Sequence, residues 1–153
     1  MAMKICDCLH HTPPCAVALV RGDKAHGGLC GEVRFYPVGR GTLVEAEISG
    51  LPMECSFFAL HIHEGRCCTG EEADPFQDAG AHWNLLGTEH PMHTGDLPTL
   101  LGNSGYAWGA AYTERFCPAQ ARGRTVIVHA LPDDYKTQPS GGAGEKIGCG
   151  VIR

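Results

Sequence analysis

The chain has 153 residues and a formal net charge of −5, with 19% charged and 43% hydrophobic residues. This length suits one domain with one sizeable core, and the balance of residue types excludes a disordered chain. The negative charge argues against a nucleic-acid ligand, because phosphates require a basic surface, and no apolar run approaches the length of a membrane span.

The N-terminal segment, residues 1–14, is expected to be a flexible tail ahead of a single domain over residues 15–153. It lacks the apolar stretch of a secretory signal, so we expect a cytoplasmic protein, or a periplasmic or extracellular one whose leader has been removed. Nine cysteines are many for a reducing compartment, which leaves this choice open. The thiols and imidazoles of Cys6, Cys8, His10 and His11 suit Cu(I) or zinc. A copper-capturing tail and a disordered tail with reactive cysteines both remain compatible with them.

From Ala16 onward the chain consists of short candidate strands between turns rich in glycine and proline. Alternation is clear where Val44, Ala46 and Ile48 point to one face and the residues between them to the other. The expected strands are 16–20, 29–36, 42–51, 57–63, 105–112, 124–130 and 147–152. Strands at this spacing predict an all-β sandwich or Greek-key barrel. The intervening loop of about forty residues before Gly105 is expected to be functional and to be fixed by metal and a disulfide.

Histidines recur on the strands and in this loop. His61 and His63 stand at positions i and i+2 of one strand, so both imidazoles project from the same face. Such a pair alone is more often two solvated side chains, and His129 at the end of another strand is unremarkable by itself. The loop supplies four further donors, namely His82, His90, His93 and Asp96.

These donors form two sets with the chemistry of two different metals. Three imidazoles and a carboxylate suit tetrahedral zinc, and four imidazoles suit tetragonal Cu(II). The zinc set comprises His82, His90, His93 and Asp96. The copper set comprises His61, His63, His82 and His129. Seven residues complete two four-coordinate sites only when one is shared, and His82 is the candidate for the shared ligand.

Five segments that carry these residues resemble copper,zinc superoxide dismutases, especially the bacterial type: HIHE, GAHWN, HPMHTGDLP, GRTVIVHALPDD and GGAGEKIGCGVI. The resemblance extends from Ala16 to Ile152. It implies an eight-stranded Greek-key β-barrel of immunoglobulin-like type, copper and zinc in the two sets above, and dismutation of superoxide to dioxygen and hydrogen peroxide. It implies a catalytic part for His82, which takes up a proton. A homodimer is expected from the family alone.

The resemblance also implies roles for residues outside the metal sets. Asp133 matches an aspartate that links a copper-ligand histidine to a zinc-ligand histidine. Cys149 matches one half of a disulfide between the long loop and the last strand. Its partner is one of the adjacent Cys67 and Cys68, and the spacing in bacterial relatives favours Cys68. Only one of two neighbouring side chains is expected to reach Cys149.

Two departures from the family concern the substrate. Lys146 stands where the family usually has an arginine beside the copper, three residues before the last-strand cysteine. Lysine keeps the charge without the planar set of donors, so we expect a catalytic role for Lys146 with reduced activity, against the alternative of a surface lysine. The segment 131–145 is shorter than in many relatives, which predicts a more open copper site and weaker attraction of the anion.

Other functions stay open at this stage. The first alternative is a non-enzymatic copper-binding or copper-delivery module on the same fold, although such modules tend to lack ligands that this chain has. A copper-only relative and a structural β-sandwich with incidental histidines are further alternatives. Neither a nucleic acid nor a membrane is expected as a partner.

Overall fold

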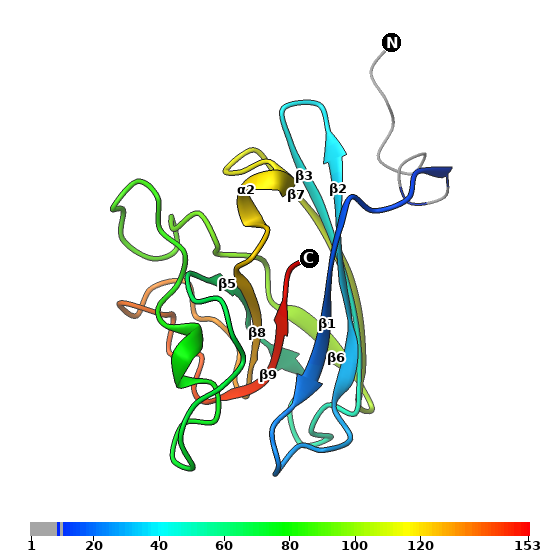
Figure 1. The fold of residues 1–153 in the computed structure, drawn as a ribbon. Coiled ribbons are helices and arrows are strands. Elements are labelled where there is room, and N and C mark those ends of the chain that lie inside the picture. The colour runs from blue at the N-terminus through cyan, green and yellow to red at the C-terminus, as the bar shows by residue number, and fades with distance from the viewer. Residues whose placement is uncertain (1–8, 10) are drawn as a thin grey trace.

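A computed structural model describes residue 9 and residues 11–153 (Figure 1). Cys6, Cys8 and His10, on which the choice between a copper-capturing and a disordered tail depends, lie outside the described residues. The division into a tail of residues 1–14 and a domain of residues 15–153 stays a prediction. Within the described part of the chain, no helix is long and apolar enough to cross a membrane.

The described residues form an antiparallel β-barrel with almost no helix. The strands are β1 (Ala16–Gly22), β2 (Cys30–Val38), β3 (Gly41–Ser49), β4 (Phe57–Phe58), β5 (Leu60–His63), β6 (Leu100–Asn103), β7 (Tyr106–Thr113), β8 (Thr125–His129) and β9 (Lys146–Val151). The short helices are η1 (Gln77–Ala79) and α2 (Pro118–Ala121). The expected all-β fold is thus confirmed.

The strands form one sheet in the order β4-β6-β7-β3-β2-β1-β9-β8-β5. Its two outer strands, β4 and β5, are separated by Ala59 alone, so the sheet curls into a nearly closed barrel. The pairs β7–β3 and β1–β9 join strands that are distant in sequence, as connections across the barrel ends require in a Greek-key arrangement.

The described strands number nine rather than the expected eight. The single strand expected over 57–63 is divided, because the Ala59 amide donates to Leu131 and the flanking residues pair with different neighbours, β6 and β8. Residues 100–103 form a strand that the sequence pattern does not predict, because two leucines followed by glycine and asparagine show no alternation of apolar and polar residues.

The core lies inside the barrel and contains the predicted faces of the strands. Val44, Ala46 and Ile48 of β3 are at most 3% exposed, as their alternation predicts. A second, smaller apolar cluster covers the outer surface of β8 and β9, where Phe76 and Ala79 of the long loop pack on Ile127. Both faces of β5 and β8 are covered, so neither strand has an exposed side.

Two connections cover the outside of β5 and β8. The first is the long loop 64–99, and the second is segment 131–145, and the two lie on the same side of the barrel (Figure 1). They are joined by reciprocal hydrogen bonds, in which His90 donates its amide to Gln138 and the Gln138 amide donates to the His90 carbonyl, at 3.0 and 2.7 Å. The two loops therefore form one unit over the strand histidines.

Candidate metal centre

Four imidazoles from three elements meet between the barrel and the loops. β5 and β8 are paired, so His61 and His63 lie beside His129. An isolated backbone β-bridge between His63 and His82 brings the loop histidine into the group. The His61 and His82 ring centroids are 4.0 Å apart, and the Nε2 atoms of His63 and His129 are 3.4 Å apart. All four residues are buried. The structure thus brings together the complete predicted copper set.

The second predicted set meets on the other side of His82. Rings of His82, His90 and His93 are 5.5–5.6 Å apart, and His82 Nδ1 lies 2.7 Å from a carboxylate oxygen of Asp96. The other Asp96 oxygen lies 3.0 Å from His90 Nδ1 without the alignment of a hydrogen bond. In each set, one donor atom from every residue lies within 4.8 Å of the others, and His82 belongs to both.

Hydrogen bonds on the outer side of the rings decide which nitrogen can bind a metal. His63 Nδ1 donates to the Gly80 carbonyl at 2.7 Å, and His129 Nδ1 donates to the Gly144 carbonyl at 3.2 Å. His61 Nε2 donates to Asp133 at 2.8 Å. A neutral imidazole that donates through one nitrogen presents a lone pair on the other, so these bonds fix the tautomers and aim the lone pairs inward.

Three of the inward nitrogens lack protein partners. His61 Nδ1, His82 Nε2 and His90 Nδ1 are fully buried and accept or donate no hydrogen bond. Buried polar atoms without partners are costly, and convergent nitrogen lone pairs repel one another, so a cation between them removes both penalties. The residues of both sets therefore fit a bound metal ion.

Burial keeps the strand imidazoles neutral and ready for a metal. Desolvation lowers the pKa of His129 to about 3 and the pKa of His63 well below its ordinary value, with neighbouring imidazoles adding to both shifts. Desolvation also lowers the pKa of His61, against the opposing effect of the Asp133 carboxylate. Because metal ions bind the deprotonated nitrogen, these shifts remove the competition with protons at neutral pH.

Asp133 joins the two sets from outside. It is buried, and its two carboxylate oxygens accept hydrogen bonds from His61 Nε2 at 2.8 Å and from His90 Nε2 at 2.9 Å. Burial raises the pKa of this carboxyl, but the bonds from His61, the Tyr135 amide and His90 outweigh it and hold the pKa below its usual value. The carboxylate therefore stays charged and orients one histidine of each set.

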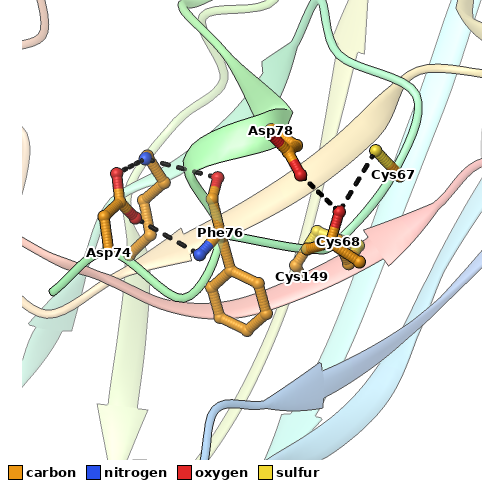
Figure 2. Close-up of a disulfide and its surroundings, with 8 residues drawn as sticks. Cys67, Cys68, Asp74, Phe76, Asp78 and Cys149 are labelled. Carbon is orange, nitrogen blue, oxygen red and sulfur yellow. Dashed lines mark hydrogen bonds and ion pairs between the residues drawn. A yellow bond between two sulfur atoms is a disulfide. The ribbon is translucent and has the colours of Figure 1, made fainter. Parts of the chain in front are cut away.

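The disulfide pairing is resolved in favour of Cys68. Cys68 and Cys149 are bonded with an S–S distance of 2.00 Å, and the bridge joins the long loop to β9 (Figure 2). The neighbouring Cys67 is an exposed free thiol whose sulfur lies 3.4 Å from the Thr69 hydroxyl. The pairing of Cys68 with Cys149, which the resemblance to bacterial relatives favours, is thereby confirmed.

Lys146 lies next to the copper set but is already paired. It stands opposite His129 in the β8–β9 register, and its positive charge contributes to the lowered pKa of that histidine. Its ammonium donates to the Asp74 carboxylate and, at 3.3 Å, to the Phe76 carbonyl of the long loop. Lys146 lines an open cleft of about 880 Å³ together with Gly144, which holds His129.

The charges around this cleft favour cations over anions. Two lysines line it, Lys24 and Lys146, against four carboxylates. The carboxylates belong to Asp23, Glu72, Asp74 and Glu145. Weak attraction of a small anion follows from these lining charges. The more open copper site expected from the short segment 131–145 stays a prediction.

Arg115 is a site residue that sequence reasoning missed. Its guanidinium donates to the carbonyls of Pro91 and His93 at 3.0 and 2.9 Å, which ties the segment carrying two zinc-set histidines to the barrel. The next residue, Phe116, is buried and packs on Trp83, which follows His82. An arginine between β7 and α2 has no spacing relation to the metal ligands, so no sequence signal points to it.

Comparisons with known proteins agree on one family. The family model described as copper/zinc superoxide dismutase matches residues 29–152. A copper–zinc superoxide dismutase of Caulobacter vibrioides is 36% identical, with 90% of this chain and 85% of the relative covered. One of Deinococcus radiodurans is 34% identical, with 83% and 79% covered. The solved structure of a Cu/Zn superoxide dismutase from Brucella abortus superposes with a TM-score of 0.78 at 26% identity, covering 90% of this chain and 99% of that one.

Proposed function

Because this chain belongs to the copper/zinc superoxide dismutase family, we propose that its two histidine sets perform the metal chemistry of that family. Its activity is the dismutation of superoxide to dioxygen and hydrogen peroxide, and its cofactors are copper and zinc. Copper is assigned to His61, His63, His82 and His129. Zinc is assigned to His82, His90, His93 and Asp96. The observation that carries these assignments is the convergence of buried inward nitrogens without protein partners.

Bound copper supplies a one-electron redox couple, and bound zinc supplies a fixed positive charge. The protein contributes rigid orientation, because the outer nitrogens of His61, His63 and His129 are held by hydrogen bonds. His82 Nε2 is buried without a hydrogen bond, while Nδ1 of the same ring lies against Asp96. Nε2 is therefore the atom at which His82 holds a proton when its other nitrogen stays engaged.

Lys146 is proposed to orient the superoxide anion at the edge of the copper set. Its position opposite His129 and in the wall of the cleft supports this role. The Asp74 carboxylate competes with the substrate for the same ammonium, so Lys146 provides weaker attraction than an unpaired cation. The alternative is a purely structural ion pair that fastens the long loop to β9.

The test of this function is reconstitution with copper and zinc, followed by superoxide decay and the visible spectrum of Cu(II). Loaded wild-type protein is expected to consume superoxide catalytically. His61→Ala is expected to abolish the activity and alter the Cu(II) spectrum, whereas Arg40→Gln, at an exposed side chain outside the lining of the cleft, should preserve both. A fully loaded protein without dismutase activity would instead support a copper-delivery module on the same fold.

A homodimer is a further proposal, supported by the outer face of β3 and β7. Tyr106 and Trp108 are 40% and 48% exposed, and both side chains donate to glutamates of β3, Glu47 and Glu45. A flat face of fixed aromatic rings among paired charges suits an isologous contact. Light scattering coupled to size exclusion is expected to give twice the chain mass, and Trp108→Glu is expected to give a monomer.

An oxidising compartment is proposed as the place of action, periplasmic or extracellular rather than cytoplasmic. The support is the Cys68–Cys149 bridge, since structural disulfides persist mainly where glutathione and thioredoxin do not reduce them. Cell fractionation with thiol trapping tests this proposal. Recovery of the native protein in the cytoplasmic fraction with both cysteines reduced would contradict it.

A further inference from the structure

A groove on the outside of the barrel contains the disulfide. It has a volume of about 500 Å³ and lies over the junction of β1 and β9, away from the metal sets. Its lining comprises Val17, Leu19, Arg21, Cys68, Cys149, Gly150, Val151 and Arg153. Cys149 is 3% exposed, whereas Cys68 is only half-buried. Cys68 is therefore the more accessible of the two bonded residues.

The charged side chains of this groove are all positive. Arg21 stands directly opposite Cys149 in the β1–β9 register, so the two side chains leave the same face of the sheet as neighbours. Arg153 is held by reciprocal backbone hydrogen bonds with Val17 at 3.0 Å. The lining includes no acidic side chain, although the chain carries a net charge of −5. The charged side chains around this disulfide are thus both cationic.

A thiol of the same chain is poorly placed to attack this bond from the neighbouring strand. Cys30 is an exposed free thiol opposite Arg21 on β2. Two strand spacings separate it from Cys149, roughly 10 Å between Cα atoms. A disulfide requires a Cα–Cα distance of less than about 7 Å, so Cys30 cannot form a bond to Cys149 in place of Cys68 without movement of the backbone. The groove is open to a thiol from solution.

We propose that this groove is a recognition site for low-molecular-weight thiols that carry carboxylates, for which glutathione serves as the probe. The carboxylates face Arg21 and Arg153, and the thiolate sulfur attacks Cys68 Sγ. A bond forms between the incoming sulfur and Cys68, the Cys68–Cys149 bond breaks, and its electron pair leaves on Cys149 as a thiolate beside Arg21. The incoming thiol has lost its proton to water, and the Cys149 thiolate can take one up from water, so no other oxidant or reductant is required.

The experiment compares two thiols on the full chain with both metals bound, in a Cys67→Ser background that removes the adjacent thiol. The thiols are glutathione and its diethyl ester, which keeps the peptide and the sulfur but lacks both carboxylate charges. The quantity measured is the second-order rate constant for mixed-disulfide formation with glutathione, divided by the constant for the diethyl ester at the same pH and ionic strength. Arg40→Gln is the matched control, because it removes the same charge from an 86% exposed side chain of the β2–β3 turn.

Arg21→Gln and Arg153→Gln are each expected to lower this ratio about two- to fivefold, the range for one exposed charge pair, with Arg21→Lys close to wild type. High salt should lower the wild-type ratio in the same way, and mass spectrometry should find glutathione on Cys68. An unchanged ratio in both glutamine variants overturns the proposal, as does an equal decrease in Arg40→Gln. Glutathione on Cys149 instead of Cys68 overturns the assigned direction of attack.

Discussion

The ion pair between Asp74 and Lys146 gives the most direct test of how this protein treats its substrate. Asp74→Asn removes one negative charge and keeps the side-chain oxygen that accepts the Phe76 amide at 3.2 Å, so the local turn should persist. Lys146 then presents an ammonium with a neutral partner to the cleft. We expect a higher rate constant for the reaction with superoxide.

The magnitude follows from the contact geometry. A superoxide anion hydrogen-bonded to the Lys146 ammonium would lie about 5–6 Å from the Asp74 carboxylate, given hydrogen bonds of about 3 Å. Repulsion between unit charges at this distance in water is about 0.7 kcal/mol, and physiological salt reduces it to about 0.4 kcal/mol. The side chain of Asp74 is 42% exposed, which justifies the use of a water-like dielectric. The expected gain is about twofold at physiological salt and about threefold at low salt.

The assay is stopped-flow decay of superoxide at several ionic strengths, with copper and zinc content matched between samples. Glu114→Gln is the control for net charge, because this 49% exposed glutamate pairs with Arg40 outside the lining of the cleft. Lys146→Ala should lower the rate, and Asp74→Asn should give no gain when combined with it. An unchanged rate and salt dependence in Asp74→Asn, at full metal content, would refute the competition between Asp74 and the substrate.

Three further predictions concern the supports of the metal sets. Asp133→Asn leaves one oxygen where two imidazoles now donate, so zinc affinity in a chelator competition should fall about 10- to 100-fold, and unchanged affinity would contradict the link between the sets. Arg115→Ala should weaken zinc binding several-fold and shift the spectrum of Co(II) bound in the zinc site, while the Cu(II) spectrum is retained. Arg115→Lys should restore part of the zinc affinity. Equal losses of affinity for both metals would indicate a general structural defect. Cys68→Ser should destabilise the metal-free protein by about 2–4 kcal/mol in urea unfolding, whereas Cys67→Ser should have little effect; equal effects would contradict the observed pairing.

The amino-acid sequence alone indicated most of the strands and the two donor sets. The alternation of apolar and polar residues in β3 is a local property of the sequence. It predicted the burial of Val44, Ala46 and Ile48. The grouping of His61 with His129 in one donor set followed from their residue type, whereas their meeting depends on the pairing of β5 with β8. The placement of metals in these sets remains the proposal tested above.

Only the tertiary structure decided features that depend on contacts between distant segments. The selection of Cys68 over Cys67 depends on which side chain the folded loop turns toward β9. The pairing of Lys146 with Asp74 brings together residues 72 positions apart, and Arg115 reaches the His93 carbonyl across 22 positions. Local sequence patterns indicate whether a residue prefers a buried or an exposed position. These contacts depend instead on the path of loops, which show no periodic sequence pattern. The candidate ligands of this centre were therefore readable in sequence, and Asp133 through the family resemblance, whereas Arg115 and the partner of Lys146 were not.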